Sequence, residues 1–157
     1  MPDRSLTLLL SSPDRTAEFA RKLANTLTQG DVVLLSGPVG AGKSHFCRSL
    51  IGEILTLPED IPSPTFTLVQ TYDTTAGSLW HSDLYRISSP YEIEELGLTE
   101  AFDKAICLVE WPDRLGSLAP DNALSITLSY GDSDTARVLD ADWSDEKWSK
   151  RVEAAAS

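Results

Sequence analysis

The sequence predicts an α/β fold with a mixed parallel and antiparallel sheet flanked by helices. Two continuous apolar runs, residues 31–35 and 105–109, have the pattern of strands whose two faces are both buried. Helical patterns alternate with these runs, which is typical of a sheet with helices packed on it. Two pairs of β-rich segments are joined by short polar turns and predict hairpins, so we expect antiparallel strands beside the parallel ones.

The first elements are defined by their capping residues. Residues 5–10 predict a short strand. A helix over residues 12–28 begins with Ser12 as its N-cap and Pro13 at the first helical position, and Gly30 stops it. Apolar residues recur at helical spacing within this segment, so one of its faces should pack against the sheet.

The later elements follow from the same kinds of signal. They are a helix at about 43–55, a loop with three prolines at 58–64, a hairpin with strands at 65–72 and 79–86, a short helix from the capping box at 89–92 to near 97, the strand at 105–109, a hairpin with strands at 124–130 and 136–140, and a helix after 144. No repeat or linker interrupts them, so we expect a single domain over residues 1–157, with a C-terminal tail that frays from about residue 150.

Composition and charge argue against several classes of protein. Asp and Glu outnumber Lys and Arg by 24 to 13, which gives a net charge of −11. A protein that grips RNA or DNA by itself needs a basic stripe, so here a partner protein would have to hold any nucleic acid. No apolar run approaches the roughly 20 residues of a membrane span, and no signal-peptide pattern is present, so we expect a cytoplasmic protein. Cys47 and Cys107 match no metal-ligand spacing and are interpreted as small buried hydrophobes rather than a disulfide.

One motif carries the chemistry. The pattern G-x-x-x-x-G-K-[ST] is matched in full by Gly37, Pro38, Val39, Gly40, Ala41, Gly42, Lys43 and Ser44. It follows an apolar strand and opens a helix, so backbone amides and the positive end of the helix dipole would face the same phosphates. Lys43 would reach the β- and γ-phosphates, and the Ser44 hydroxyl would bind Mg²⁺. Because no Asn-Lys-x-Asp motif for guanine is present, ATP with Mg²⁺ is the predicted cofactor.

Further candidate residues lie elsewhere in the chain. Glu110 ends an apolar strand, where its carboxylate would reach Mg²⁺ at the carboxyl edge of the sheet. Asp83 also ends a β-like stretch and is either a second acid of the site or a solvated loop residue. Thr65 lies in a Ser-Pro-Thr loop, which is either a switch segment that senses a γ-phosphate or an ordinary polar turn. His45 either touches a phosphate or faces solvent, and His81 fits a packed or hydrogen-bonded residue better than a ligand.

Taken together, these strings resemble one family. Besides SGPVGAGKS from residue 36, the chain carries SPTFTLV from residue 63, HSDLYR from residue 81, ELGL from residue 95 and ICLVEWP from residue 106. In this order and spacing they are similar to the TsaE family, the bacterial ATPase of tRNA threonylcarbamoyladenosine biosynthesis. The match covers roughly residues 12–130.

The resemblance implies a small P-loop ATPase with a mixed sheet that binds two partner proteins, TsaB and TsaD. In that complex TsaD transfers a threonylcarbamoyl group to an adenosine beside the anticodon, and the ATPase supports turnover and meets tRNA only indirectly. Carried onto this chain, the resemblance makes Ser44 and Glu110 the Mg²⁺ ligands and Lys43 the phosphate clamp. It makes Asp83 the acid near the γ-phosphate and places Thr65 in the switch-like segment.

The chain departs from the family pattern at two points. Ser44 and His45 stand where the family usually has two threonines, so the metal-binding hydroxyl is kept and the second hydroxyl has no counterpart. Ser82 replaces a residue that is usually aromatic. Trp111, by resemblance, would flank the site.

Three hypotheses about function stay open at this point. The first is an ATPase that serves a tRNA-modifying complex and is slow alone, because no arginine finger is evident near the P-loop. The second is a binding module whose partner affinity is gated by nucleotide occupancy of the Ser63–Thr65 loop. The third is a small-molecule kinase, which the absence of an Arg-rich lid disfavours.

Overall fold

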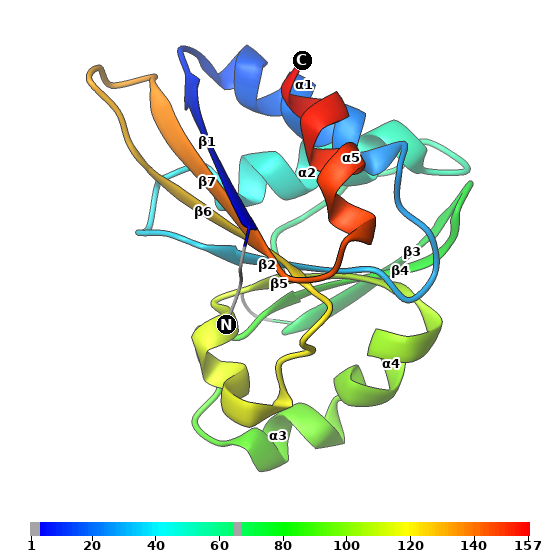
Figure 1. Cartoon of the computed structure of the whole chain (residues 1–157). Coiled ribbons are helices and arrows are strands. Elements are labelled where there is room, and N and C mark those ends of the chain that lie inside the picture. Colours follow the sequence, from blue (N-terminus) through cyan, green and yellow to red (C-terminus); the bar gives the residue numbers. More distant parts are fainter. Residues whose placement is uncertain (1–3, 65–66) are drawn as a thin grey trace.

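A seven-stranded mixed sheet forms the centre of the computed structural model, which describes residues 4–64 and 67–157. Its order is β1-β7-β6-β2-β5-β4-β3 (Figure 1). The strands are β1 (Arg4–Leu10), β2 (Val32–Ser36), β3 (Val69–Thr74), β4 (Gly77–Asp83), β5 (Ile106–Glu110), β6 (Leu124–Tyr130) and β7 (Arg137–Trp143). The central strands β4, β5, β2 and β6 run parallel, whereas β1, β7 and β3 are antiparallel to their neighbours. The predicted α/β fold with a mixed sheet is therefore confirmed.

Helices cover both faces of the sheet (Figure 1). On one face lie α1 (Pro13–Ala24), α2 (Lys43–Ile54) and α5 (Lys147–Ala156), and on the other lie α3 (Pro90–Glu95), α4 (Leu98–Lys104) and the 3₁₀ helix η1 (Pro112–Leu118). Strand β2 contributes Val33 and Leu35 to the first core and Val32 and Leu34 to the second, as its continuous apolar pattern predicts. Among the helices of the described ranges, none has the length and apolar character to cross a membrane.

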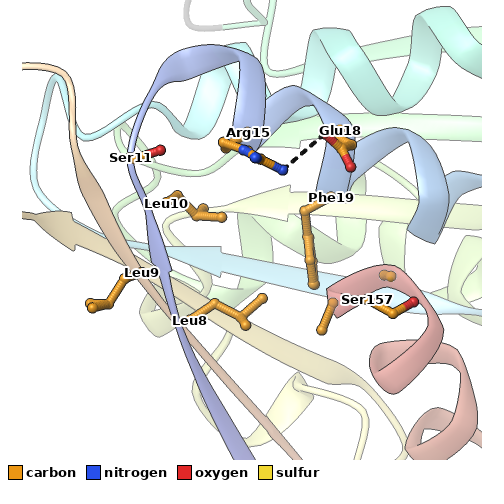
Figure 2. A pocket seen from close by; sticks show the side chains of 10 residues that line it. Leu8, Leu9, Leu10, Ser11, Arg15, Glu18, Phe19 and Ser157 are labelled. Atoms are coloured by element: carbon orange, nitrogen blue, oxygen red, sulfur yellow. Dashed lines mark ion pairs between the residues drawn. The ribbon is translucent and has the colours of Figure 1, made fainter.

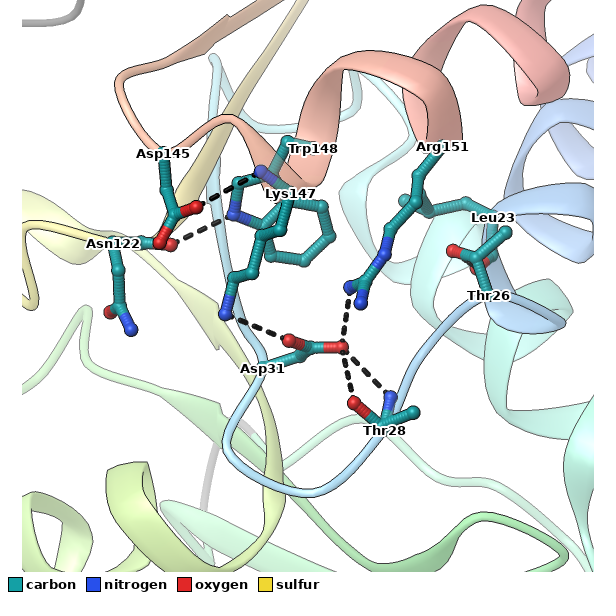
Figure 3. A network of polar contacts seen from close by, with 9 residues as sticks. All are labelled: Leu23, Thr26, Thr28, Asp31, Asn122, Asp145, Lys147, Trp148 and Arg151. Atoms are coloured by element: carbon teal, nitrogen blue, oxygen red, sulfur yellow. Dashed lines mark hydrogen bonds and ion pairs between the residues drawn. The ribbon is translucent and has the colours of Figure 1, made fainter.

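Asp31, just before β2, ties the C-terminal helix to the central sheet (Figure 3). Its carboxylate lies 2.9 Å from Lys147 Nζ and 2.7 Å from Arg151 Nη1, and it accepts the Thr28 amide at 2.8 Å. Burial raises the pKa of Asp31, but the Thr28 hydrogen bond and the two cations outweigh burial, so its pKa lies below the ordinary value. The network fixes α5 against the start of β2.

The C-terminal segment differs from its prediction of fraying from about residue 150. Helix α5 continues to Ala156, and Val152 and Ala155 are buried in the first core. Trp148 of α5 is fully buried and donates from Nε1 to the carbonyl of Asn122 at 2.8 Å. The polar, Ala-rich end is therefore an ordered amphipathic helix whose apolar face packs on the sheet.

The structure also differs from the sequence prediction in where some elements end and in two helices that were not predicted, α4 and η1. The first helix ends at Ala24, because Asn25 and Thr26 side chains donate back to the carbonyls of Arg21 and Leu23 and close the last turn. Gly97, interpreted as a stop, also leads into α4. The second missed helix, η1, begins at Pro112 directly after Trp111, and its sequence has no clear periodic pattern. Strand β3 begins at Val69, and the predicted strand start at residues 65 and 66 lies outside the described residues.

The two cysteines lie on opposite faces of the sheet. Cys47 of α2 belongs to the first core and Cys107 of β5 to the second, and both are fully buried and free. The sheet between them prevents a disulfide. The interpretation of both residues as small buried hydrophobes is confirmed.

Candidate functional site

The carboxyl ends of β2, β4 and β5 meet at one edge of the sheet. Leu35 pairs with Glu110, and Glu110 pairs with Asp83, so the ends of three neighbouring parallel strands lie in register. A pocket of about 420 Å³ opens there, lined by Val39, Gly40, Gly42, Lys43, Ser44, His45, Arg48, Asp83, Tyr85, Glu110 and Trp111. Ligands of parallel α/β sheets bind at this edge. The predicted lysine, hydroxyl and carboxylates are therefore brought together around one space.

The glycine-rich loop between β2 and α2 curls into a cradle. Gly37, Gly40 and Gly42 have φ angles of 140°, 83° and 103°. A Cβ on Gly37 would lie 2.2 Å from the carbonyl oxygen of Leu128 in β6, so only glycine fits this approach. Helix α2 begins at Lys43 and points the positive end of its dipole toward the pocket. Gly37, Pro38 and Ala41 shape the loop without lining the pocket.

Lys43 is buried and folded over the loop. The residue is 6% exposed, its ammonium donates to the carbonyl of Gly37, and Nζ lies 3.9 Å from the centre of the Trp111 ring. Burial lowers the pKa of Lys43, against the opposing effect of the Glu110 and Asp83 carboxylates. The Gly37 carbonyl accepts one of the three donors of this buried ammonium, and the Trp111 ring lies over it, so an anionic phosphate would suit its charge and its donors.

Two buried carboxylates face this lysine. Glu110 is 2% exposed and Asp83 is 6% exposed. Glu110 Oε2 lies 2.7 Å from His81 Nε2, and Asp83 Oδ1 accepts the Tyr85 amide at 3.0 Å. His81 is thus a hydrogen-bonded buried residue, which is the interpretation that the sequence favours. Together with the Ser44 hydroxyl, the carboxylates form a set of hard oxygen donors of the kind that Mg²⁺ prefers.

Trp111 closes one side of the pocket. It follows β5 directly, its amide donates to the Leu35 carbonyl at 3.2 Å, and its φ of 59° turns the chain sharply. Its ring lies 4.8 Å from the Tyr85 ring, centroid to centroid. Trp111 therefore covers the Lys43 ammonium on this side of the pocket.

Two further candidates from the sequence, His45 and Thr65, are not shown to act in the site. The His45 ring Nε2 lies 3.0 Å from the carbonyl oxygen of Pro13, although the residue also lines the pocket. Thr65 lies outside the described residues, so its predicted role stays a prediction. The adjoining segment does reach the site, because the Asp83 amide donates to the Leu68 carbonyl at 3.1 Å.

Two residues that sequence reasoning missed hold the loop from the other side. The Tyr130 hydroxyl donates to the Val39 carbonyl at 2.5 Å, and the Arg137 guanidinium donates to the carbonyls of Ala41 and Gly40 at 3.2 and 3.3 Å. Both residues belong to the β6–β7 hairpin. No motif marks them, because a long stretch of chain separates each from the loop that it contacts.

A second pocket of about 320 Å³ lies between β1, the start of α1 and the end of α5 (Figure 2). It is lined largely by apolar side chains such as Leu8 and Phe19, and its charged side chains, Arg15 and Glu18, pair with each other at 3.6 Å. It lacks a convergent set of catalytic groups, so the chemistry points to the P-loop pocket instead.

Comparison with known proteins finds similar sequences and a similar fold. The family model described as "Threonylcarbamoyl adenosine biosynthesis protein TsaE" matches residues 10–139. A protein of that name from Rickettsia bellii is 41% identical over 126 residues, which cover 80% of this chain and 88% of the relative. The Bacillus subtilis protein of that name is 34% identical over 128 residues, covering 81% and 79%. The crystal structure of Bacillus subtilis YdiB superposes with a TM-score of 0.79 at 26% identity, covering 97% of this chain and 94% of that one.

Proposed function

The chain belongs to the TsaE family, which is involved in tRNA threonylcarbamoyladenosine biosynthesis, and on that premise we propose that it is a Mg²⁺-dependent ATPase. It supports transfer of a threonylcarbamoyl group to the adenosine beside the anticodon of tRNA, in a complex with TsaB and TsaD. The single observation that carries the ATPase assignment is the convergence of Lys43, Asp83 and Glu110 on the P-loop pocket.

The residues present fit Mg²⁺ and a triphosphate. The loop carries no side chain at Gly42, where a Cβ would meet nothing within 4 Å, so backbone can approach phosphate oxygens closely. Ser44 and Glu110 supply the oxygen ligands for the metal. When bound with ATP, Mg²⁺ would neutralise charge on the β- and γ-phosphate oxygens.

Three side chains of the pocket would have different roles in the reaction. Lys43 would leave the Gly37 carbonyl and bind the β- and γ-phosphates, to which its positive charge is complementary. The buried carboxylate of Asp83 would orient the attacking water, and its fixed backbone contact with Tyr85 holds it in place. Trp111 would keep bulk water from the lysine, which strengthens the electrostatic attraction within the site.

Charge supports an indirect relation to tRNA. At a net charge of −11 the chain repels a polyphosphate backbone, so the complex and not this subunit would hold the tRNA. We accordingly propose that TsaB and TsaD supply the nucleic-acid contacts and stimulate the hydrolysis.

The test is phosphate release from Mg²⁺–ATP by the purified chain, alone and with purified TsaB and TsaD. We expect slow release alone and faster release in the complex, and we expect Glu110→Gln to abolish both. Equal release by wild-type protein and Glu110→Gln would contradict the assignment of the site. Hydrolysis that neither partner changes would contradict the proposed complex.

A second candidate function is nucleotide-gated partner binding. It is favoured by the hydrogen bond from the Asp83 amide to the Leu68 carbonyl, which connects the segment after the predicted switch loop to the site. Partner affinity measured with ATP, ADP and a non-hydrolysable analogue separates the two. Equal affinity in all three states would exclude gating, and tighter binding with the analogue than with ADP would support it.

A further inference from the structure

Two side chains of the β6–β7 hairpin, Tyr130 and Arg137, contact the P-loop on the face away from the pocket. Neither lines the pocket, and β6 lies beside β2 on the side opposite β5. Their hydrogen bonds go to three consecutive loop carbonyls, those of Val39, Gly40 and Ala41. We call this pair of side chains the hairpin clasp.

We propose that Tyr130 and Arg137 are positioning residues that pre-organise the phosphate cradle of the P-loop. This inference rests on the proposed nucleotide function and adds to it the two residues that set the loop's shape. The clasp holds loop carbonyls outward and thereby directs loop amides into the pocket.

Peptide geometry links the carbonyls to the amides. In a planar trans peptide group the C=O and the N–H point in opposite directions. The Val39 carbonyl shares its peptide group with the Gly40 amide, and the Ala41 carbonyl shares its group with the Gly42 amide. Gly40 and Gly42 both line the pocket. Anchoring these two carbonyls on the hairpin therefore aims two amides at the space where phosphate oxygens would lie.

The clasp is itself held rigid. Arg137 Nη1 donates to the carbonyls of Asp134 and Ala136, each at 2.8 Å, and its Cζ lies 5.3 Å from the Tyr130 ring centre. All of these acceptors are neutral, and in the part of the chain that the structure describes no ion pair neutralises the guanidinium. Its charge therefore adds to the attraction that the loop exerts on an anion.

The loop without the clasp would lose these constraints. Only one turn contact within it is made by its own backbone, the Ala41 amide to the Pro38 carbonyl at 3.1 Å. Free carbonyls could then rotate toward the pocket, where they would repel phosphate oxygens. Binding would have to reorder the loop, which lowers affinity.

The inference is tested by the dissociation constants of ATP and inorganic tripolyphosphate, each with Mg²⁺, measured by calorimetry on the full chain. Arg137→Gln should weaken both about tenfold, because it removes the two hydrogen bonds to the loop carbonyls and a nearby charge. Tyr130→Phe, which removes only one hydroxyl, should weaken both about threefold. Arg137→Lys should restore part of the affinity, since it keeps the charge and loses the planar fork. The matched control is Arg15→Gln, the same charge change on an exposed helix residue, which should bind as wild type does.

Amide hydrogen exchange supplies a readout that a purely structural role would not move. In Arg137→Gln and Tyr130→Phe the Ala41 amide, which donates to the Pro38 carbonyl within the loop, should exchange faster, while exchange in β5 stays unchanged. If wild-type protein binds ATP and both variants bind it equally well with unchanged exchange, the positioning role of the hairpin clasp is overturned and the proposed function stands. If wild-type protein binds neither ATP nor tripolyphosphate, the proposed function is contradicted, and so is the positioning role of the hairpin clasp.

Discussion

His81 and Glu110 form a buried pair across two adjacent parallel strands, with His81 Nε2 2.7 Å from Glu110 Oε2. Their side chains are 1% and 3% exposed, so the contact is shielded from water. Glu110 also lines the P-loop pocket, so His81 holds one oxygen of a carboxylate that belongs to the site. Outer partners of this kind set the geometry of metal-binding carboxylates.

The first prediction concerns this pair. His81→Leu should leave the Glu110 carboxylate buried without its partner and should weaken Mg²⁺-dependent nucleotide binding by about 10- to 100-fold. His81→Gln keeps a donor at a similar position and should weaken it less. Calorimetric titration of Mg²⁺ into the ATP-loaded chain measures the effect. Identical Mg²⁺ affinities in wild type and the leucine variant would show that His81 does not position Glu110.

The second prediction concerns the approach of the P-loop to β6. Gly37→Ala places a Cβ 2.2 Å from the Leu128 carbonyl oxygen, and backbone on both sides cannot move aside without separating the loop from the sheet. We expect a loss of about 3 kcal/mol in the free energy of unfolding. Gly116→Ala is the matched control, because its φ of 53° is also left-handed but its Cβ would meet nothing within 4 Å. The control should lose less, because only its backbone conformation is strained, and denaturant unfolding that gives equal losses for both would contradict the steric argument.

The third prediction concerns the Asp31 network that anchors α5. Asp31→Asn removes the charge that pairs with Lys147 and Arg151 and should cost about 2 kcal/mol of unfolding free energy at neutral pH. We take a moderate value because the two cations are partly exposed, at 26% and 23%. Asp132→Asn, a change at an exposed turn residue, is the control and should cost almost nothing.

The pH dependence of this variant follows from the lowered pKa of Asp31. Because the pKa is lower in the folded state than the ordinary 3.8, the carboxylate stabilises the fold fully above that value and loses its contribution as pH falls through the folded pKa. The stability difference between wild type and Asp31→Asn should therefore be constant near neutrality and shrink below about pH 4. A difference that stays constant into strong acid would contradict the ion-pair explanation.

The fourth prediction concerns the two buried thiols. Burial raises the pKa of Cys107 to about 12 and raises the pKa of Cys47 well above its ordinary value. Both should therefore resist a thiol-specific disulfide reagent at pH 8 in the native chain and react fully once it is unfolded. Rapid labelling of either cysteine in the native state, followed by mass spectrometry, would contradict the burial that both cores give them.

Local signals predicted the fold well where a segment's own sequence decides its structure. The apolar runs of β2 and β5 and the P-loop string between β2 and α2 could be recognised from adjacent residues alone. Helix α4 was missed although Leu98, Ala101 and Phe102 are buried at helical spacing, because Gly97 was interpreted only as a stop. A glycine can end one helix and precede the next, and sequence position does not distinguish the two.

The sequence could predict single residues of the site but not the contacts between them. Glu110 and Asp83 could be proposed because each ends a β-rich segment, but their pairing across β4 and β5 depends on the register of the sheet. The Arg137 contacts join residues 96 and 97 positions apart, and a hairpin strand carries no signal for such a contact. His81 could be expected to form a hydrogen bond, although its partner could not be named.

The most direct test of the account is calorimetric titration of Mg²⁺–ATP into the wild-type chain and Lys43→Met. The substitution keeps an unbranched side chain of similar length and removes the ammonium that lies over the Trp111 ring, and Lys150→Met at an exposed position of α5 is the control. We predict saturable binding at a single site in wild type and control, and binding weaker by about 10- to 100-fold in Lys43→Met, as expected for loss of hydrogen bonds to a charged group. Equal affinity for Mg²⁺–ATP in wild type and Lys43→Met would contradict the claim that this pocket binds the nucleotide.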